Sequence, residues 1–566
     1  MDAPGPAAAS GAGSAAKETP APPTRDPRGG EVLWTVVLLA VAFALRLGVA
    51  ARMPIIEVDG AYWCGLGATM AHSNWQGGLH TAWPPLYPTL IAGVLPYLGG
   101  GGALAQVRLE WAARLVSVVA GTLLLLPLGS LSRRLLPGKW ARAVLLVAAV
   151  HPRLVEYSAA ALAESVFTLA VVGGIAALAR GVEPKPSPES GSAGWQVMAG
   201  VCFGFGFLAR PEALPLGLGL WLASWLVRGR TRPPGTRRSR VRPDFALAMI
   251  VVCMPWLIFL HHRTGGWTLG EKGTYNFWRA HREAHARHFP PPEALPRRVN
   301  RSPEIAPPPR PGEVRPFEIL RREPGAVLGK SLRQLGTLLV STYPVTIGWP
   351  VALLALAGFL VPRAGPWWVV WMPMAIAPLL LAPFSVDRRF LVPMVPLALP
   401  LAAAALAALG GRWRGWPAPA LTAVLATGLL AYALGIPARA DRAPELRDAG
   451  AWVREAWRRE GKESGRPVVM ARKPYVAFYS GGLIADLIDA PPESILADAR
   501  RTGVDILVAD ARAARGDRPQ IAGWLERAPD GWSLIQRRDS PEPVSLLGPS
   551  RSLSKVRPNA PRLRRR

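Results

Sequence analysis

The sequence predicts an α-helical protein that crosses a membrane many times and carries a small α/β domain after its last span. Half of the 566 residues are hydrophobic, which is rare in a soluble chain of this length. The chain also contains 22 tryptophans, a residue that favours membrane interfaces. Several of its apolar runs reach the ~20 residues that a helix needs to span a bilayer.

Residues 1–31 are rich in Ala, Gly and Pro and show no periodic apolar pattern, so we expect a disordered cytoplasmic leader. Residues 32–51 form the first membrane-length apolar run. This run is longer than a signal-peptide core and is followed by more apolar runs, which favours a transmembrane helix.

The apolar pattern continues to residue 436, which defines a transmembrane domain of residues 32–436. Counting the first run, we expect roughly eleven spans. The further runs cover residues 109–131, 141–157, 160–179, 195–208, 214–227, 245–260, 340–361, 367–383, 390–409 and 418–436.

Basic residues lie in alternate short loops, at residues 133–142, 180–185, 228–242, 363 and 412–414. If the first helix runs outward, all of these loops are cytoplasmic, as the positive-inside rule requires. This topology places the long loops 53–106 and 263–333 and the C-terminal region outside. The arginines of loop 263–333 do not oppose it, because long loops are translocated regardless of charge.

Residues 437–548 have a soluble pattern and are predicted to form the extracytoplasmic α/β domain. It opens with an amphipathic helix, followed by strands at 467–470, 504–509, 532–536 and 544–547 and helices at 494–501 and 521–527. Residues 549–566 form a basic tail. The apolar face of the first helix contains Leu446, Ala449, Val453 and Trp457.

Charge and cysteine content exclude other classes. The net charge of +28 could indicate a nucleic-acid partner, but the basic residues lie between apolar runs and are explained by topology. The three cysteines are far apart and give neither a disulfide framework nor metal-ligand spacing. No metal site is predicted, although a divalent-metal cofactor stays open. The histidines of the second long loop, which we expect to be solvated, are His261, His262, His281, His285 and His288.

Two acids, Glu57 and Asp59, directly follow the first span. A carboxylate at the mouth of a membrane protein can accept a proton from a reactant at the lipid surface. The alternative is an ordinary solvated loop charge.

A third acid, Glu164, lies in an otherwise uncharged apolar span. Carboxylates inside a membrane are costly and are functional candidates by default. The alternative is an acid at a helix N-terminus, where the helix dipole favours negative charge. Arg153 and Glu156 lie shortly before it at the same predicted depth.

Cations gather on the same predicted outer face. Arg210, Arg388 and Arg389 are candidates to bind a phosphate, with Lys272 a weaker one. The alternative for the arginines is that they anchor the helix ends at the membrane interface.

Several short motifs follow one another along residues 32–409. They are Asp59-Gly60-Ala61-Tyr62, Trp83-Pro84-Pro85-Leu86-Tyr87-Pro88, Ala113-Arg114-Leu115, Pro152 through Glu164-Ser165, Ala209-Arg210-Pro211-Glu212, and Arg389-Phe390-Leu391-Val392-Pro393 with Pro396. In order, spacing and predicted sidedness the chain resembles bacterial GT-C glycosyltransferases. The branch it resembles is related to protein O-mannosyltransferases and lipid A aminoarabinose transferases.

This resemblance implies that Asp59 is the catalytic base, because those families use an acid in the first outer loop. They often have a second acid directly after it, where this chain has Gly60, so Glu57 or Glu164 is left to take that role. We also expect substrate contacts from residues in or beside these motifs: Tyr62, Trp83, Tyr87 and Arg153.

The implied reaction is an inverting sugar transfer from a polyprenyl-phosphate donor to a hydroxyl of a protein, lipid or glycan acceptor. Asp59 would deprotonate the acceptor, and Arg388, Arg389, Lys272 or Arg210 would stabilise the departing phosphate. The implied location is the outer face of a bacterial inner membrane. A transporter or flippase of lipid-linked sugars is the alternative, although the sequence shows no convincing internal repeat. A polymerase or ligase of lipid-linked oligosaccharides also stays open.

Overall fold

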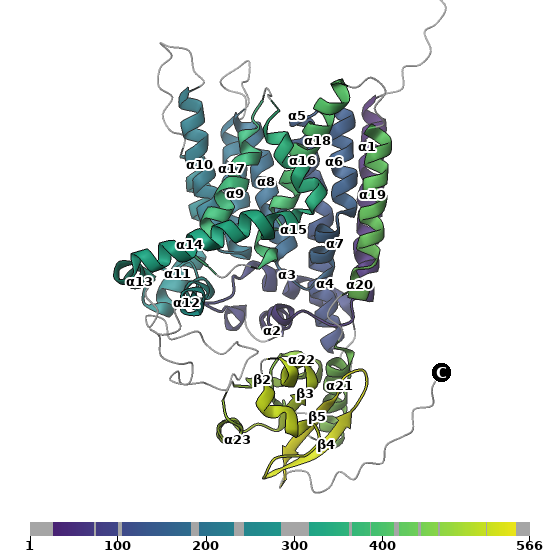
Figure 1. The fold of residues 1–566 in the computed structure, drawn as a ribbon, viewed down its shortest axis with the longest axis vertical. Helices are drawn as coiled ribbons and strands as arrows, with labels where there is room; N and C mark the ends of the chain where they lie inside the picture. The colour runs from purple at the N-terminus through teal and green to yellow at the C-terminus, as the bar shows by residue number, and fades with distance from the viewer. Residues whose placement is uncertain are drawn as a thin grey trace, which may run out of the picture.

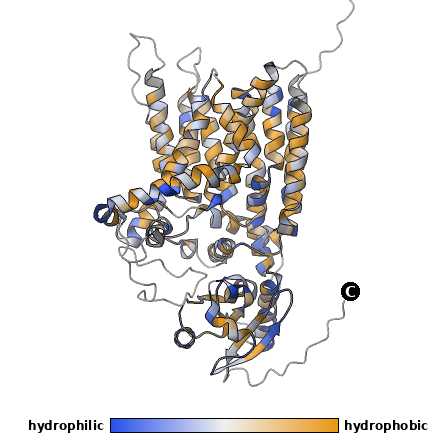
Figure 2. Ribbon diagram, in the orientation of Figure 1, coloured by the Kyte–Doolittle hydropathy of each residue, from blue (hydrophilic) through white to orange (hydrophobic). Residues whose placement is uncertain are grey.

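The computed structural model describes residues 27–72, 75–99, 105–182, 192–230, 243–284, 316–361, 365–384, 387–412, 418–439, 443–461, 465–488, 490–516 and 518–550. A bundle of apolar helices forms one end of the molecule and a small α/β domain forms the other (Figure 1). Hydropathy divides the molecule in the same way, with a hydrophobic bundle and a mixed, more polar C-terminal domain (Figure 2).

Within the described residues, five helical segments are long and apolar enough to cross a membrane, and a bent pair would make a sixth. The protein is therefore a multi-pass membrane protein, while the expected count of eleven spans is not confirmed. The long segments are α1 (Pro27–Arg52), α4 (Ala105–Leu123) with α5 (Leu125–Leu135), α8 (Glu164–Val182), α11 (Asp244–Thr264) and α19 (Ala418–Leu434) with α20 (Ile436–Arg439).

The bent pair turns by 114° at Gly348, whose φ of 89° suits glycine. Its first arm contains α14 (Pro324–Thr337), a π-helical turn (Leu338–Thr342) and α15 (Tyr343–Ile347), and its second is α16 (Trp349–Phe359). The shorter apolar helices are α3 (Leu86–Val94) with η2 (Leu95–Leu98), α9 (Ser192–Ala209), α10 (Ala213–Arg230), α17 (Trp368–Leu381) and α18 (Met394–Arg412).

Two boundaries differ from the sequence expectation. The run at 141–157 is two helices, α6 (Gly138–Val150) and α7 (Pro152–Ala159), because Pro152 cannot continue the hydrogen-bond ladder and holds His151 extended. Helix α1 already begins at Pro27, inside the segment expected to be a disordered leader. Residues 1–26 of that leader and residues 551–566 of the basic tail lie outside the described residues.

The first long loop, residues 53–106, folds back as helices at the lower end of the bundle. It contains α2 (Val58–His72) and η1 (Trp75–Gly78), followed by α3. The described ends of the second long loop, residues 263–333, form α12 (Glu271–Ala284) and α13 (Pro316–Arg322). In Figure 1, α2 lies between the bundle and the C-terminal domain.

The C-terminal domain has one five-stranded sheet of order β2-β1-β3-β5-β4. Strand β1 is parallel to β2 and β3, whereas β5 is antiparallel to β3 and β4. The strands are β1 (Val468–Ala471), β2 (Leu483–Asp486), β3 (Ile506–Asp510), β4 (Trp532–Arg538) and β5 (Val544–Pro549). The sequence pattern predicted four of them and missed β2.

The domain's helices are α21 (Pro444–Arg459), α22 (Tyr475–Ser480), α23 (Pro492–Arg501) and α24 (Ala511–Arg515). The predicted amphipathic helix is α21, which buries Leu446, Ala449 and Val453. The helix expected at 521–527 is instead a 3-10 segment, η7 (Pro519–Leu525). Helix α22 contacts α2 and α4, which joins the domain to the bundle.

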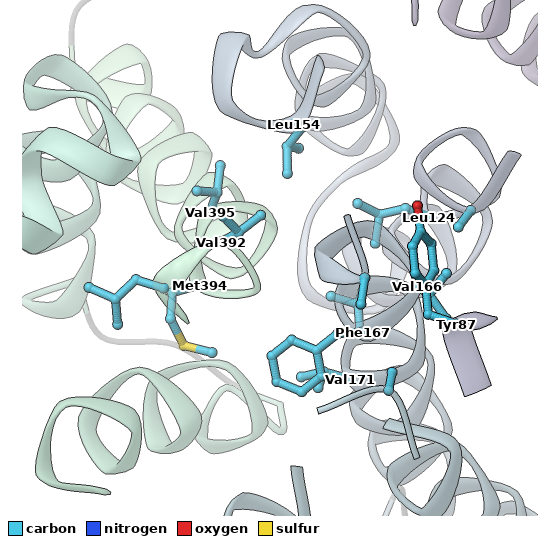
Figure 3. Close-up of a cluster of buried hydrophobic side chains, with 14 of the residues drawn as sticks. Tyr87, Leu124, Leu154, Val166, Phe167, Val171, Val392, Met394 and Val395 are labelled. Atoms are coloured by element: carbon cyan, nitrogen blue, oxygen red, sulfur yellow. The ribbon is translucent and has the colours of Figure 1, made fainter. Parts of the chain in front are cut away.

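An apolar core supports the starts of α8 and α18. Val166, Phe167 and Val171 of α8 gather in one cluster with residues of the 392–395 segment, including Met394 (Figure 3). Helix α8 also packs against α4 and α9. Packed apolar side chains therefore support the polar residues at the starts of these two helices.

Candidate active site

Charged side chains of four chain segments line one small cavity of about 60 Å³, and a fifth segment pairs with two of them. The first turn of α2 supplies Asp59, and the first residue of α8 supplies Glu164. Arg210 follows α9, Lys272 begins α12, and Arg389 lies in η6 (Arg388–Leu391). The sequence separates these residues by up to 330 positions, and the fold joins them.

Asp59 is held by two cations through the same carboxylate oxygen. Its Oδ2 lies 2.5 Å from Arg389 Nη1 and 3.3 Å from Lys272 Nζ. Burial alone would raise the pKa of Asp59, but the Lys272 and Arg389 charges outweigh it and lower the pKa to about 2. Asp59 is therefore ionised, and its carboxylate is already paired with two cations in this structure.

Lys272 is positioned by an aromatic ring as well as by Asp59. Its Nζ lies 3.5 Å from the centre of the Trp83 ring, a cation–π contact. Burial lowers the pKa of Lys272 to about 8, because the attraction of Asp59 only partly offsets the loss of water. Hydrogen bonds from Thr81 Oγ1 to Glu271 and from the Glu271 N–H to the Thr81 carbonyl tie the start of α12 to the loop that carries Trp83.

Glu164 anchors the other half of the cluster. Its side chain is 2% exposed, and its Oε1 lies 2.5 Å from Arg210 Nη1 and 3.9 Å from Arg389 Nε. Arg210 also pairs with Glu212 at 3.3 Å and stacks on Phe390 at 4.4 Å. Arg389 thus bridges the two acids and makes Asp59 and Glu164 members of one network.

The charges of this network balance. Its carboxylates are Asp59, Glu164 and Glu212, and its cations are Arg210, Lys272 and Arg389, which gives three charges of each sign. An added phosphate group must therefore compete with these carboxylates for the cations. Of the two acids that pair with Arg389, Asp59 is the more accessible, with 18% of its side chain exposed against 2% for Glu164.

The structure explains why Gly60 follows Asp59. A Cβ atom at this position would lie 2.8 Å from the carbonyl oxygen of Ala161 and 3.0 Å from its Cβ. No acidic side chain fits between α2 and this backbone without displacing one of them. A second acid for the cavity has to come from elsewhere, and both Glu164 and Glu212 line it.

Glu57 faces a different environment from Asp59. Its Oε2 accepts a hydrogen bond from the Ala161 N–H at 2.8 Å, whereas its Oε1 is buried without a partner in the described part of the chain. Burial raises the pKa of Glu57 to about 6, although Arg114 and the Ala161 N–H oppose the rise. Glu57 does not line the cavity, so its contact positions the Asp59 loop against the segment before Glu164.

The structure distributes the other predicted site residues unevenly. Trp83 lines the cavity, and Tyr62 stacks on Trp83 with ring centres 6.0 Å apart. Tyr87 is buried outside the cavity, where its hydroxyl bonds to Ala113 and Ser117. Arg153 pairs with Glu156 on α7, and Arg388 is exposed and outside the network. Substrate contacts by these last three residues stay predictions.

Sequence reasoning missed the residues that hold the Asp59 loop from the side of the C-terminal domain. The N–H of Ile56 donates to the Tyr479 hydroxyl at 3.0 Å, and this hydroxyl lies 3.0 Å from Glu110 Oε2. Arg447 donates to the carbonyl of Pro54 at 3.1 Å. No motif signals these contacts, because Tyr479 follows Ile56 by 423 positions.

Buried charged residues of α4 also hold the loop that ends at Asp59. Arg114 pairs with Glu110 at 2.5 Å and donates to the carbonyls of Ala50 and Ile55 at 2.9 and 3.2 Å. Arg114 stands in one of the predicted motifs, and the structure gives it this supporting position. The loop that ends at Asp59 is therefore fixed from the bundle and from the C-terminal domain.

Metal binding has no support in the parts of the chain that the structure describes. No group of three or more His, Cys, Asp or Glu side chains there is arranged to hold an ion. His261 stacks on Trp267, with ring centres 4.6 Å apart. His285 and His288 lie outside the described residues, as does the side chain of His281.

A family model described as dolichyl-phosphate-mannose-protein mannosyltransferase matches residues 91–259, which include Glu164 and Arg210. The chain also resembles ArnT from Cupriavidus metallidurans bound to undecaprenyl phosphate. The two are 15% identical with a TM-score of 0.52, over 92% of this chain and 98% of that one.

This chain has the GT-C fold of membrane glycosyltransferases. A second similar structure is the archaeal oligosaccharyltransferase AglB from Archaeoglobus fulgidus in complex with an inhibitory peptide and a dolichol-phosphate. It is 13% identical with a TM-score of 0.53, over 85% of this chain and 70% of that one. No curated protein sequence matches the chain. The GT-C resemblance read from the motifs is thereby confirmed at the level of the fold.

Proposed function

We propose that the protein is an inverting glycosyltransferase that moves a sugar from a polyprenyl-phosphate donor to an acceptor hydroxyl. The observation that carries this proposal is the pairing of Asp59 with Arg389 and Lys272 through one oxygen, at a cavity beside an apolar bundle. A carboxylate beside two cations supplies both a proton acceptor and a phosphate-binding pair.

The donor phosphate competes with Asp59 for these cations. A glycosyl phosphodiester carries one negative charge, and the departing polyprenyl phosphate gains a second, so Arg389 and Lys272 stabilise the products more than the donor. As the cations turn toward phosphate, Asp59 loses the two charges that lower its pKa and becomes a stronger base. Donor binding thereby prepares the base that activates the acceptor.

Two similar structures support a lipid-phosphate donor, since one is bound to undecaprenyl phosphate and the other to a dolichol-phosphate. The acceptor class stays broad: protein, lipid or glycan. The reaction is placed at the outer face of a bacterial inner membrane. This placement rests on the positive short loops and on the position of α2 and the C-terminal domain at one end of the bundle.

The decisive measurement is release of polyprenyl phosphate from a radiolabelled polyprenyl-phosphate sugar in proteoliposomes. We expect the wild-type protein to release it together with transfer of the sugar to acceptors from a membrane extract. Asp59→Asn should lower transfer by roughly 100- to 10,000-fold, the usual contribution of a general base. Equal folding of the variant is checked by its melting temperature.

The same experiment separates the proposal from a flippase or transporter. Such a protein moves labelled sugar lipid from one leaflet to the other without releasing polyprenyl phosphate. Leaflet movement with intact donor would contradict the proposal, and full transfer by Asp59→Asn would remove Asp59 from the role of base.

A further inference from the structure

A second cavity, of about 310 Å³, lies between α2, the start of α4 and the C-terminal domain. Its volume falls at the lower end of the range for small-molecule sites, about 300–1,000 Å³. The Asp59 cavity is only about 60 Å³. Helix α2 separates the two, because Asp59 and Trp63 line the first cavity while Tyr62, Gly65 and Thr69 line the second.

Two polar side-chain groups at the second cavity have no protein partner within the described chain. Tyr62 is 6% exposed, yet its hydroxyl has no hydrogen-bond partner within the described chain. The side-chain amide of Gln106, which also lines the cavity, likewise has none there. Gln106 is half-buried, and both groups keep their hydrogen-bonding capacity for a ligand.

The remaining lining residues define the chemistry of that ligand. Arg466 donates to the carbonyls of Gly481 and Gly482 at 2.9 and 3.2 Å, and its other N–H groups are free to point elsewhere. The ring of Phe478 adds an apolar surface, and no Asp or Glu lines the cavity. An aromatic surface combined with several hydrogen-bonding groups suits a hydroxylated ring compound better than an acyl chain.

Stacked rings lie between the two cavities. Tyr62 stacks on Trp83 at an interplanar angle of 20°, and Trp83 carries Lys272 on its ring. A ligand bonded to the Tyr62 hydroxyl therefore lies one side chain away from the wall of the Asp59 cavity.

We propose that this second cavity is a sugar-binding subsite that holds a sugar unit of a glycan acceptor while the reacting hydroxyl enters the Asp59 cavity. The acceptor role rests on the proposed glycosyl transfer, whereas the sugar binding does not. The subsite contributes to acceptor choice. The residues that bind the sugar are Tyr62 and Gln106 from the membrane domain and Arg466 from the C-terminal domain.

Binding is tested on the purified full-length protein by saturation-transfer NMR with a panel of soluble sugars: the methyl glycosides of glucose, galactose, mannose and arabinose, and N-acetylglucosamine. The detergent must lack a sugar headgroup, since a maltoside would compete. We expect saturable binding of at least one sugar. Tyr62→Phe, which keeps the ring and its stacking, and Gln106→Leu should each weaken it by about tenfold, the usual effect of one hydrogen bond.

Tyr97→Phe is the matched control, because Tyr97 is 88% exposed and lies outside the cavity. It should bind the sugar as the wild-type protein does. Absence of binding by the whole panel, or equal binding by Tyr62→Phe and Gln106→Leu, overturns the proposal. If Asp59→Asn loses sugar binding and Tyr62→Phe does not, the sugar binds in the first cavity. This result would also overturn the proposal.

A kinetic experiment distinguishes the subsite proposal from the glycosyltransferase proposal. With membrane-extract acceptors, Tyr62→Phe should raise the KM for acceptor about tenfold and leave the KM for donor within about twofold. A protein that binds sugar but never releases polyprenyl phosphate would contradict the glycosyltransferase proposal alone. An active protein whose acceptor KM is unchanged by Tyr62→Phe would contradict the subsite alone.

Discussion

Lys272 is the cation of the site whose charge can change near physiological pH. Burial lowers its pKa to about 8, whereas Arg389 and Arg210 stay protonated. Below pH 8, Lys272 is charged and pairs with Asp59 or with a donor phosphate. Above pH 8 it loses its proton, and one of the two cations beside Asp59 is neutralised.

We therefore expect kcat/KM for the donor to fall as pH rises through about 8, because this ratio reports the free enzyme. Lys272→Arg should move the decline upward by more than one pH unit, since an arginine stays charged. No acid-side decline from Asp59 is expected above pH 4, because its pKa of about 2 keeps it ionised. Initial rates between pH 5 and pH 10 test this, and an unchanged alkaline limb in Lys272→Arg would remove Lys272 as its cause.

The junction between α2 and the segment before α8 is set by the absence of a side chain at Gly60. A methyl group there would meet the Ala161 carbonyl at 2.8 Å, and Ala161 is also the donor to Glu57. Overpacking of this kind typically costs about 1–3 kcal/mol. The shift that relieves it moves Asp59, one residue away, relative to Glu164.

Gly60→Ala should consequently lower the melting temperature by a few degrees and reduce transfer at least about tenfold. The matched control is Gly93→Ala on α3, where an added Cβ meets nothing within 4 Å and alanine favours the helix. Thermal unfolding and sugar transfer are measured on both variants. If Gly60→Ala behaves like Gly93→Ala, the close contact does not position the loop.

The contact of α22 with the Asp59 loop makes the C-terminal domain part of the site's support. Tyr479 is 3% exposed and bonds both to the Ile56 N–H and to Glu110. Tyr479→Phe removes these bonds while the ring stays against Arg447, 5.3 Å away. The loop then loses one of its fixed points, three residues before Asp59.

For Tyr479→Phe we expect kcat to fall about tenfold, with KM for the donor within about twofold, because Arg389 and Lys272 lie on other elements. Tyr97→Phe serves as the exposed control. Equal losses in kcat and in the amount of folded protein would indicate a purely structural role. A rise in donor KM alone would mean that Tyr479 acts on donor binding.

At the scale of the whole molecule, the sequence predicted the apolar bundle, its GT-C resemblance and the acids and cations of the site. The motifs carry Asp59, Glu164, Arg210 and Arg389, and the fold brings these four together. The pattern could not reveal β2 or the role of Tyr479. Four-residue strands give a weak periodic signal, and contacts across hundreds of positions leave no local signature.

The sequence could not predict the number of membrane spans for a related reason. Helices α6 and α7 are separated by one extended residue before Pro152, and α15 and α16 meet at the sharp bend of Gly348, so continuous apolar runs do not correspond to single helices. The sidedness of the bundle depends on charge rather than on span count. It remains a separate prediction with its own measurement.

The arrangement in Figure 1 places α2 and the C-terminal domain at one end of the bundle and the connection between α5 and α6 at the other. The helix ends on either side of this connection carry Arg133, Arg134 and Lys139, which the positive-inside rule assigns to the cytoplasm. A cysteine at the exposed Glu526 should therefore react with a membrane-impermeant maleimide in intact cells, whereas one at the exposed Lys139 should react only after lysis. The parent chain gives the background, since Cys64 and Cys253 are buried and Cys202 is partly buried. The reverse labelling pattern would turn the site toward the cytoplasm and contradict transfer at the outer face.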